Sequence, residues 1–187
     1  MKLVGKNIII RDLKYNDLDA YFLYGQDPNV GPNAGWKPFT SKEVAGRVLT
    51  SQIFNKETYA ITLKEKDVLI GTISLYNSSI RKYNKAKSLG FSLNSSYWGY
   101  GYMPQAVKLI VAYAFENTDC EVLELGHHIE NYRSKRVAEK CGFTFDGTLC
   151  KYKKLYDGRL VTACFYSMTK EDYERMKKNE SDIKDKI

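Results

Sequence analysis

The sequence lacks an apolar run long enough to cross a membrane. Its longest such run is the seven residues 109–115, whereas a spanning helix needs about 20. The N-terminus also lacks the apolar segment of roughly 7–15 residues that a secretory signal requires. Because 43% of the 187 residues are hydrophobic, a folded core is still expected. We therefore expect a soluble cytoplasmic protein with one domain over residues 1–187 and a charged tail at about 176–187.

Histidine and cysteine are too few and too poorly spaced for a metal site. The two histidines, His127 and His128, are adjacent in the chain and do not have the spacing of zinc ligands. The four cysteines, at positions 120, 141, 150 and 164, include no Cys-x-x-Cys pair. In a reducing compartment we expect them to be buried as small apolar side chains. The sequence predicts no metal.

The net charge of +7 is concentrated in two short windows, at residues 81–87 and 151–159. The remaining residues are close to neutral as a whole. Such charge either keeps the surface soluble or binds a polyanion, which is a nucleic acid or a small molecule with phosphates. Since no recognised nucleic-acid motif is present, we do not expect nucleic acid as a partner.

Hydrophobic periodicity and turn residues predict an alternation of strands and helices. Strands are expected at 8–13, 58–63, 68–76, 88–93, 121–127, 143–152 and 160–168. Helices are expected at 16–25, 41–54, 104–117 and 131–141, and the tail from residue 170 is expected to be helical at first. The segment 28–39 is rich in Pro, Gly and Asn, so we expect a loop there. This order predicts an α/β (α+β) fold, with a mixed, mostly antiparallel central sheet of about 6–7 strands and about four helices on both faces.

A Gly-x-Gly sequence at Gly99 and Gly101 separates a predicted strand from a predicted helix. Glycines let the backbone approach a ligand closely, and the start of a helix presents free N–H groups to an anion. A pyrophosphate suits such a site, although a Gly-x-Gly sequence alone also occurs in simple tight turns. No Gly-Lys-Ser/Thr follows, and Pro104 stands where a dinucleotide fingerprint has its third glycine. The loop is therefore neither a P-loop nor a Rossmann turn.

Three sequence segments together resemble the GNAT N-acetyltransferases. They are the run Trp-Gly-Tyr-Gly-Tyr-Met-Pro-Gln-Ala at 98–106, the pair Asn131-x-x-Ser134, and Lys-Cys-Gly-Phe at 140–143. The resemblance is greatest to the RimJ/RimL-like branch, which includes ribosomal-protein N-terminal acetyltransferases, and extends from residue 10 to residue 168. It implies the GNAT fold and an acyltransferase that uses acetyl-CoA as co-substrate.

The resemblance also implies where acetyl-CoA binds. The strand that ends near Leu93 would diverge from the one that ends near His127, and the cofactor would lie in the V-shaped gap. Asn131 would bind the pantetheine arm, although the same residue is equally suited to cap a helix. The pyrophosphate would lie on the main-chain amides of Trp98, Gly99, Tyr100, Gly101, Tyr102 and Met103.

Acetyl transfer needs a polarised carbonyl and a proton for the leaving thiolate. By analogy with the family, N–H groups near Leu93 would form a small oxyanion hole. Many GNAT enzymes use a tyrosine seven residues after the asparagine as the acid, but this chain has Ala138 there. The RimJ/RimL-like branch offers a serine instead, which corresponds to Ser134. The alternative is that Ser134 is an ordinary residue of a helix surface.

The transfer also needs a base that accepts a proton from the amine. Because side chains alternate along a strand, Glu124 and His128 share one face, whereas Leu123, Leu125 and His127 share the core face. His128, with Glu124 or Glu130 behind it, is therefore the candidate base, acting through water. The alternative is an ordinary histidine at a strand end.

The cost of deprotonation favours an acceptor that is a weak base. At pH 7, neutralising a lysine costs about 4.6 kcal/mol, whereas an α-amine costs about 1.1 kcal/mol. We therefore favour a protein or peptide N-terminus. Two alternatives remain open: an acceptor that is a small-molecule amine (a polyamine or an aminoglycoside), and a non-catalytic CoA-binding module.

Trp36 and Phe39 either form a wall of the acceptor pocket or pack their loop against the core. The expected partners are acetyl-CoA and the amine acceptor, without a membrane, and a homodimer stays open.

Overall fold

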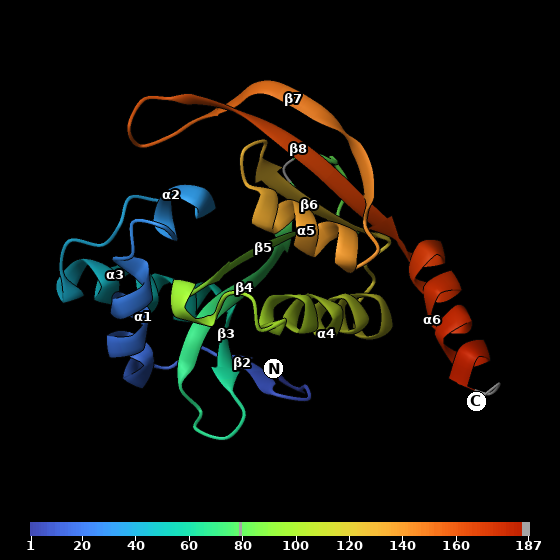
Figure 1. Cartoon of the computed structure of the whole chain (residues 1–187), viewed down its shortest axis with the longest axis horizontal. Helices are drawn as coiled ribbons and strands as arrows, with labels where there is room; N and C mark the ends of the chain where they lie inside the picture. The colour runs from blue at the N-terminus through green and yellow to red at the C-terminus, as the bar shows by residue number, and fades with distance from the viewer. Residues whose placement is uncertain (79, 185–187) are drawn as a thin grey trace.

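The computed structural model describes residues 1–78 and 80–184, over which eight strands form one sheet (Figure 1). Their spatial order is β1-β2-β3-β4-β5-β6-β8-β7. All neighbouring strands are antiparallel except β5 and β6, which are parallel. The strands are β1 (Lys2–Val4), β2 (Ile8–Asp12), β3 (Thr58–Leu63), β4 (Leu69–Asn77), β5 (Ala86–Leu93), β6 (Val122–His128), β7 (Thr144–Lys154) and β8 (Leu160–Thr169).

The described residues form six α-helices and two short 3-10 helices. They are α1 (Leu18–Gly25), α2 (Gly31–Ala34), α3 (Lys42–Asn55), α4 (Tyr102–Asn117), α5 (Tyr132–Lys140) and α6 (Lys170–Lys184), with η1 (Tyr15–Asp17) and η2 (Ser95–Tyr97). The mixed, mostly antiparallel α/β fold predicted from the sequence is confirmed. The sheet has one strand more than predicted, because β1 is only three residues long and too short to produce a pattern.

The prediction of an uninterrupted loop at 28–39 is wrong, because the segment contains helix α2. Pro32 lies in the first turn of this helix, where its missing N–H costs nothing. Gly35 ends the helix in the left-handed conformation, with φ +90°. Proline and glycine therefore bound a short helix here rather than exclude one.

Helices cover both faces of the sheet and form a separate hydrophobic cluster with each face. Two adjacent residues of β3 show this, because their side chains point to opposite faces. Ala60 packs in a cluster with α1 and α3, whereas Ile61 packs in the larger cluster with α4 and α5. The positions of α4 predicted to be apolar, namely 103, 106, 107, 110 and 114, are all buried. This periodic stripe fixes α4 against the sheet and so fixes the position of the Gly-x-Gly loop at its start.

The chain ends in the long β7–β8 hairpin and helix α6 (Figure 1). The hairpin extends past the sheet towards α2, while α6 lies at the opposite end of the molecule. The tail expected at about 176–187 is helical up to residue 184, and residues 185–187 lie outside the described residues. No described helix has the length and apolar character needed to cross a membrane.

All four cysteines are free thiols. Cys120 and Cys141 are buried as predicted, and burial raises the pKa of Cys141 to about 11. Cys164 is only partly buried, and the expectation is wrong for Cys150, which is exposed on β7. In the part of the chain that the structure describes, no group of three or more His, Cys, Asp or Glu side chains is arranged to hold a metal ion.

Candidate active site

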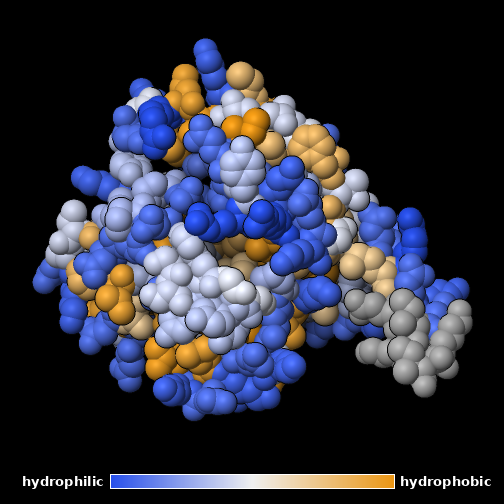
Figure 2. Space-filling view, viewed as in Figure 1, coloured by the Kyte–Doolittle hydropathy of each residue, from blue (hydrophilic) through white to orange (hydrophobic). Residues whose placement is uncertain are grey.

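The parallel strands β5 and β6 diverge in the middle of the sheet. They pair only from Ala86 with Val122 to Leu89 with Leu125. Beyond that point β5 continues to Leu93 without β6 beside it, which confirms the gap expected between these two strands. A cavity of about 370 Å³ adjoins this gap and is bordered by α2, the Gly-x-Gly loop, α4 and α5. Figure 2 shows a hollow near the centre of the corresponding face, with hydrophilic residues above it and residues of intermediate hydropathy below.

The main chain at the end of β5 presents a hydrogen-bond donor to the gap. Asn94 N–H donates to the Ile70 carbonyl of β4 at 2.8 Å. Since N–H groups of successive strand residues point to opposite sides, the Leu93 N–H points away from β4 and towards the gap. The Leu93 carbonyl accepts a bond from Trp98 Nε1 at 2.9 Å, which fixes this stretch of backbone. The N–H group at the end of β5 is thus directed towards the gap.

The Gly-x-Gly loop forms the floor of the cavity at the start of α4. Gly99 and Gly101 have φ of +86° and +77°, which other residues rarely adopt. A Cβ atom on either glycine would point into open space. Gly101 is the N-cap of α4, so the first N–H groups of this helix have no partner within it. The positive end of a 16-residue helix and two glycines therefore form a cradle for an anion.

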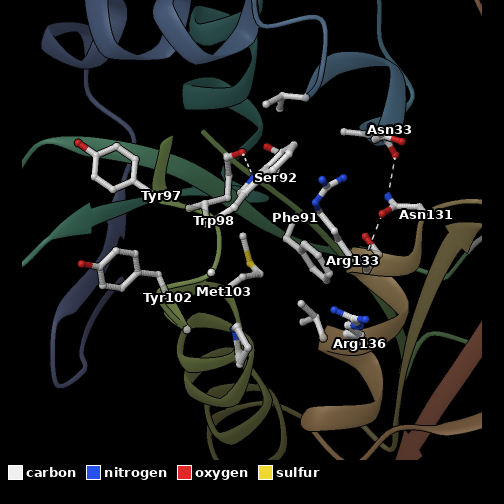
Figure 3. A pocket seen from close by; sticks show the side chains of 18 of the residues that line it. Asn33, Phe91, Ser92, Tyr97, Trp98, Tyr102, Met103, Asn131, Arg133 and Arg136 are labelled. Atoms are coloured by element: carbon white, nitrogen blue, oxygen red, sulfur yellow. Dashed lines mark hydrogen bonds between the residues drawn. The ribbon is translucent and has the colours of Figure 1, made fainter. Parts of the chain in front are cut away.

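The Asn131 side chain joins two helices beside the cavity. Its side-chain oxygen accepts the Ser134 N–H at 3.2 Å, which confirms the predicted helix cap. Its amide group donates to the Asn33 carbonyl at 3.3 Å and so connects α5 with α2 (Figure 3). Ser134 lines the cavity one helical turn from this cap. The site thus contains both residues of the Asn-x-x-Ser motif.

Helix α5 also supplies a basic face to the cavity that the sequence analysis missed. Arg133, Arg136 and Lys140 line the cavity, and the Arg133 guanidinium lies 4.3 Å from the centre of the Trp98 ring. Figure 3 shows Arg133 and Arg136 on the cavity side of the helix. The spacing of these cations, at i, i+3 and i+7, would have revealed them as one helical face.

The candidate base lies beside the cavity rather than among the residues that line it. His128 is partly buried at the end of β6. Burial first, and then the positive charges of Lys153 and Arg159, hold the pKa of His128 below its usual 6.5. The imidazole is therefore neutral at pH 7 and able to accept a proton.

The two carboxylates considered behind His128 have different surroundings. Glu124 is 2% exposed, forms an ion pair with Arg81 at 2.9 Å and accepts a hydrogen bond from Ser88. The negative charge of Glu130 raises the pKa of His128, against the larger effects that lower it.

The aromatic residues proposed around the site pack elsewhere. Phe39 lies against Gly25 and Tyr21, and Trp36 packs over Gly31. Both belong to the cluster under α1 and α3 rather than to the cavity wall. The segment nevertheless reaches the cavity through Asn29, Val30, Asn33 and Ala34. In the loop, Tyr100 is 69% exposed and does not line the cavity, whereas Tyr102, on which its ring stacks, does.

A buried cluster of three hydroxyl groups lies behind the cavity wall. Tyr24 Oη lies 3.0 Å from Thr72 Oγ1, which lies 3.1 Å from Ser92 Oγ, and Ser92 also bonds to Tyr24 at 3.4 Å. Ser92 lines the cavity. Because the three residues come from α1, β4 and β5, no local sequence pattern could have predicted the cluster.

Comparison with known proteins identifies the family. The model of the acetyltransferase (GNAT) domain matches residues 7–144. This chain belongs to the GNAT acetyltransferase family. The uncharacterized N-acetyltransferase p20 of Bacillus licheniformis is 26% identical over 178 residues, which are 91% of this chain and 97% of that protein. The ribosomal-protein-serine acetyltransferase of Escherichia coli is 28% identical over 118 residues, which are 63% and 64% of the two chains.

A solved structure of another acetyltransferase shows the same fold. The ribosomal-protein α-N-acetyltransferase RimL, in complex with coenzyme A, has a TM-score of 0.75 and 18% identity, covering 90% of this chain and 98% of that one. GNAT acetyltransferases use acetyl-CoA. In this GNAT chain the glycine cradle and the cations of α5 border one cavity, so the donor set fits a ligand that carries phosphates.

Proposed function

We propose that this GNAT enzyme transfers the acetyl group of acetyl-CoA to the N-terminal amine of a protein or peptide. The observation that supports this most directly is the convergence at one cavity of a helix N-terminus, a strand gap and a row of cations. Each feature alone has a structural explanation. Together they suit a ligand with phosphates at one end and a reactive carbonyl at the other.

The cofactor site is proposed to extend from the loop to the gap. The Trp98 N–H already donates to the Ser95 carbonyl at 3.2 Å. The N–H groups of residues 99–103 would therefore hold the pyrophosphate, and the cations of α5 would add charge-assisted hydrogen bonds of about 1.5–3 kcal/mol each. Asn131 already uses both polar atoms of its side chain, in the cap and in the bond to Asn33. A contact from Asn131 to the pantetheine arm would therefore use the second N–H of its amide group or the second lone pair of its oxygen.

The chemical steps are assigned to this chain's own groups. Bound acetyl-CoA supplies an activated thioester carbonyl. The Leu93 N–H would donate a hydrogen bond to the carbonyl oxygen, where negative charge develops. The neutral His128 imidazole would accept a proton from the acceptor amine through water, and the Ser134 hydroxyl would donate a proton to the departing sulfur.

The acceptor is proposed to enter beside α2. Asn29, Asn33 and Ala34 border the cavity there, while Trp36 and Phe39 hold the segment against the core. An α-amine is favoured because its deprotonation at pH 7 costs about 1.1 kcal/mol, against about 4.6 kcal/mol for a lysine. The similarity to a ribosomal-protein-serine acetyltransferase supports a protein N-terminus as the acceptor.

The test is release of CoA by the purified protein in the presence of acetyl-CoA and a panel of amines. Peptides with free N-termini should be turned over, whereas the same peptides with blocked N-termini should not. Faster turnover of polyamines or aminoglycosides would replace the proposed acceptor. Binding of acetyl-CoA without turnover of any amine would identify a non-catalytic CoA-binding module.

A further inference from the structure

The two basic windows of the sequence differ in how the fold uses their charge. In the first window, Arg81 forms ion pairs with Glu124 and Asp146 at 2.9 and 2.8 Å. Lys85 of the same window pairs with Glu121 at 2.7 Å. Much of this positive charge is therefore neutralised by carboxylates on β6, β7 and the residues beside them.

The second window lies at the end of the β7–β8 hairpin and keeps most of its charge. Lys151, Lys153 and Lys154 are exposed, and within the described part of the chain none of them makes an ion pair. Arg159 is paired with Asp157 at 2.7 Å. We call the three lysines the basic hairpin tip. It places three unpaired positive charges within four residues of β7.

A bulge in β7 determines where these lysines lie. Leu149 pairs with Ala163 and Lys153 pairs with Val161, so three residues of β7 stand opposite Thr162 alone. Lys151, in the middle of the bulge, has φ of +50°. A lysine seldom adopts this left-handed conformation. Bulges re-aim side chains, and strained residues often occur at functional positions.

The end of the hairpin that carries the basic hairpin tip lies beside α2, where the acceptor is proposed to enter. Figure 1 shows the hairpin reaching towards α2. A Cβ atom on Gly35, at the end of α2, would lie 3.4 Å from Lys153 Nζ. The charge of Lys153 also acts on His128 and lowers its pKa. Lys153 is thus close to both α2 and the candidate base.

We propose that the basic hairpin tip binds an acidic segment of a polypeptide acceptor, next to the amine that is acetylated. This inference rests on the proposed function and specifies the acceptor class for the same site. Carboxylates beside the amine are attracted by the three lysines, whereas polyamines and aminoglycosides are polycations and are repelled. A polypeptide fits better than RNA, because RNA provides polyanionic charge but no aliphatic amine.

The experiment compares peptides that share their first two residues and differ at positions three to six. One peptide has Asp and Glu there, and its partner has Asn and Gln. Release of CoA is measured at about pH 8, where His128 is neutral with or without nearby lysines. We expect about tenfold higher kcat/KM for the acidic peptide at low salt. The preference should largely vanish at about 0.5 M salt.

The triple variant Lys151→Gln, Lys153→Gln, Lys154→Gln should remove the preference. Its kcat/KM for the Asn/Gln peptide and its affinity for CoA should stay within about twofold, because the lysines are outside the cavity lining. A matched control removes three exposed lysines at the other end of the sheet, Lys2, Lys6 and Lys66, by the same change to Gln. The control should keep the preference, although its net charge falls equally.

Three results would overturn the inference. Equal kcat/KM for the two peptides would show that the enzyme does not sense acceptor charge. An unchanged preference in the triple variant would place the recognition elsewhere. Loss of RNA binding in that variant, with unchanged peptide kinetics, would assign the tip to nucleic acid. If the protein binds acetyl-CoA but no acceptor leads to release of CoA, the proposed function is wrong, and this inference, which rests on it, is wrong as well.

Discussion

Trp98 connects the end of β5 with helix α5, because its indole N–H bonds to Leu93 while its ring faces Arg133 at 4.3 Å. The change Trp98→Phe keeps a ring for the cation but removes the bond to the Leu93 carbonyl. That bond contributes about 1 kcal/mol. We expect kcat to fall about fivefold, because the Leu93 N–H loses its support, with KM for acetyl-CoA changed less than twofold.

The second tryptophan provides the control for this change. Trp36 Nε1 is buried without a hydrogen-bond partner among the described residues, so Trp36→Phe removes no such bond. Its kcat should stay close to that of the native enzyme. Equal losses in the two variants would show that the effect of Trp98 does not depend on its hydrogen bond.

The change Gly101→Val should abolish binding of CoA. A β-branched residue at φ +77° is strained by about 1–2 kcal/mol, and its side chain would project into the proposed phosphate cradle. Gly158→Val is the matched control, since Gly158 has φ +88° and open space around it but lies outside the cavity. Calorimetry should find at least tenfold weaker CoA binding for Gly101→Val alone, while both variants lose stability.

Removing the charge of Arg136 should weaken CoA binding about tenfold, the effect of losing one charge-assisted hydrogen bond. The salt dependence of the affinity should fall as well. Lys135→Gln is the control, because this neighbouring lysine pairs with Glu139 at 3.8 Å and does not line the cavity. If both variants bind CoA equally well, the basic face of α5 does not contact the phosphates.

Ser134→Ala should lower kcat by about 10²-fold, a typical contribution of a positioned acid. The affinity for CoA should change little, since the helix cap uses the Ser134 main-chain N–H and not its hydroxyl. Single-turnover kinetics separates the chemical step from binding. Ser134→Thr, which keeps a hydroxyl, should restore part of the rate, and a native rate in Ser134→Ala would exclude the serine as the acid.

The pH profile of kcat/KM should contain an acidic limb below pH 6.5 due to His128. The imidazole accepts a proton only when neutral, and burial and neighbouring cations hold its pKa below 6.5. Activity should therefore fall as the pH drops through that pKa. The value of kcat/KM should rise a second time near pH 8, because the α-amine of the acceptor loses its proton there.

Two substitutions separate these limbs. Lys153→Gln removes one of the positive charges that lower the pKa of His128, so the acidic limb should move to higher pH. His128→Asn should remove this limb and leave the limb of the amine. If the acidic limb stays in His128→Asn, another group is the base.

Local pattern predicted much of the fold. The apolar period of α4, the cap at Asn131 and the strands of the central sheet each depend on residues close together in the sequence. The same reasoning fails at α2, because the Pro, Gly and Asn content of 28–39 predicts a loop, whereas Pro32 and Gly35 bound a helix. Composition shows where the chain turns, but not whether a single helical turn fits between the turning points.

The candidate site was predicted only where its parts are consecutive in the chain. The glycine loop and the Asn-x-x-Ser pair are short motifs and were identified. Partners distant in sequence were not, such as Arg81 for Glu124 or Thr72 for Tyr24. The positions of Trp36 and Phe39 were also undetermined, because an aromatic side chain suits a pocket wall and a core equally well until its neighbours are known.

The divergence of β5 and β6 has a consequence for how the enzyme tolerates change. Where the two strands separate, the donor that faces the gap is a peptide N–H, which nineteen of the twenty amino acids supply equally. Side chains around Leu93 can therefore vary between distant homologues without loss of this donor. Only proline, which has no N–H, deletes it outright.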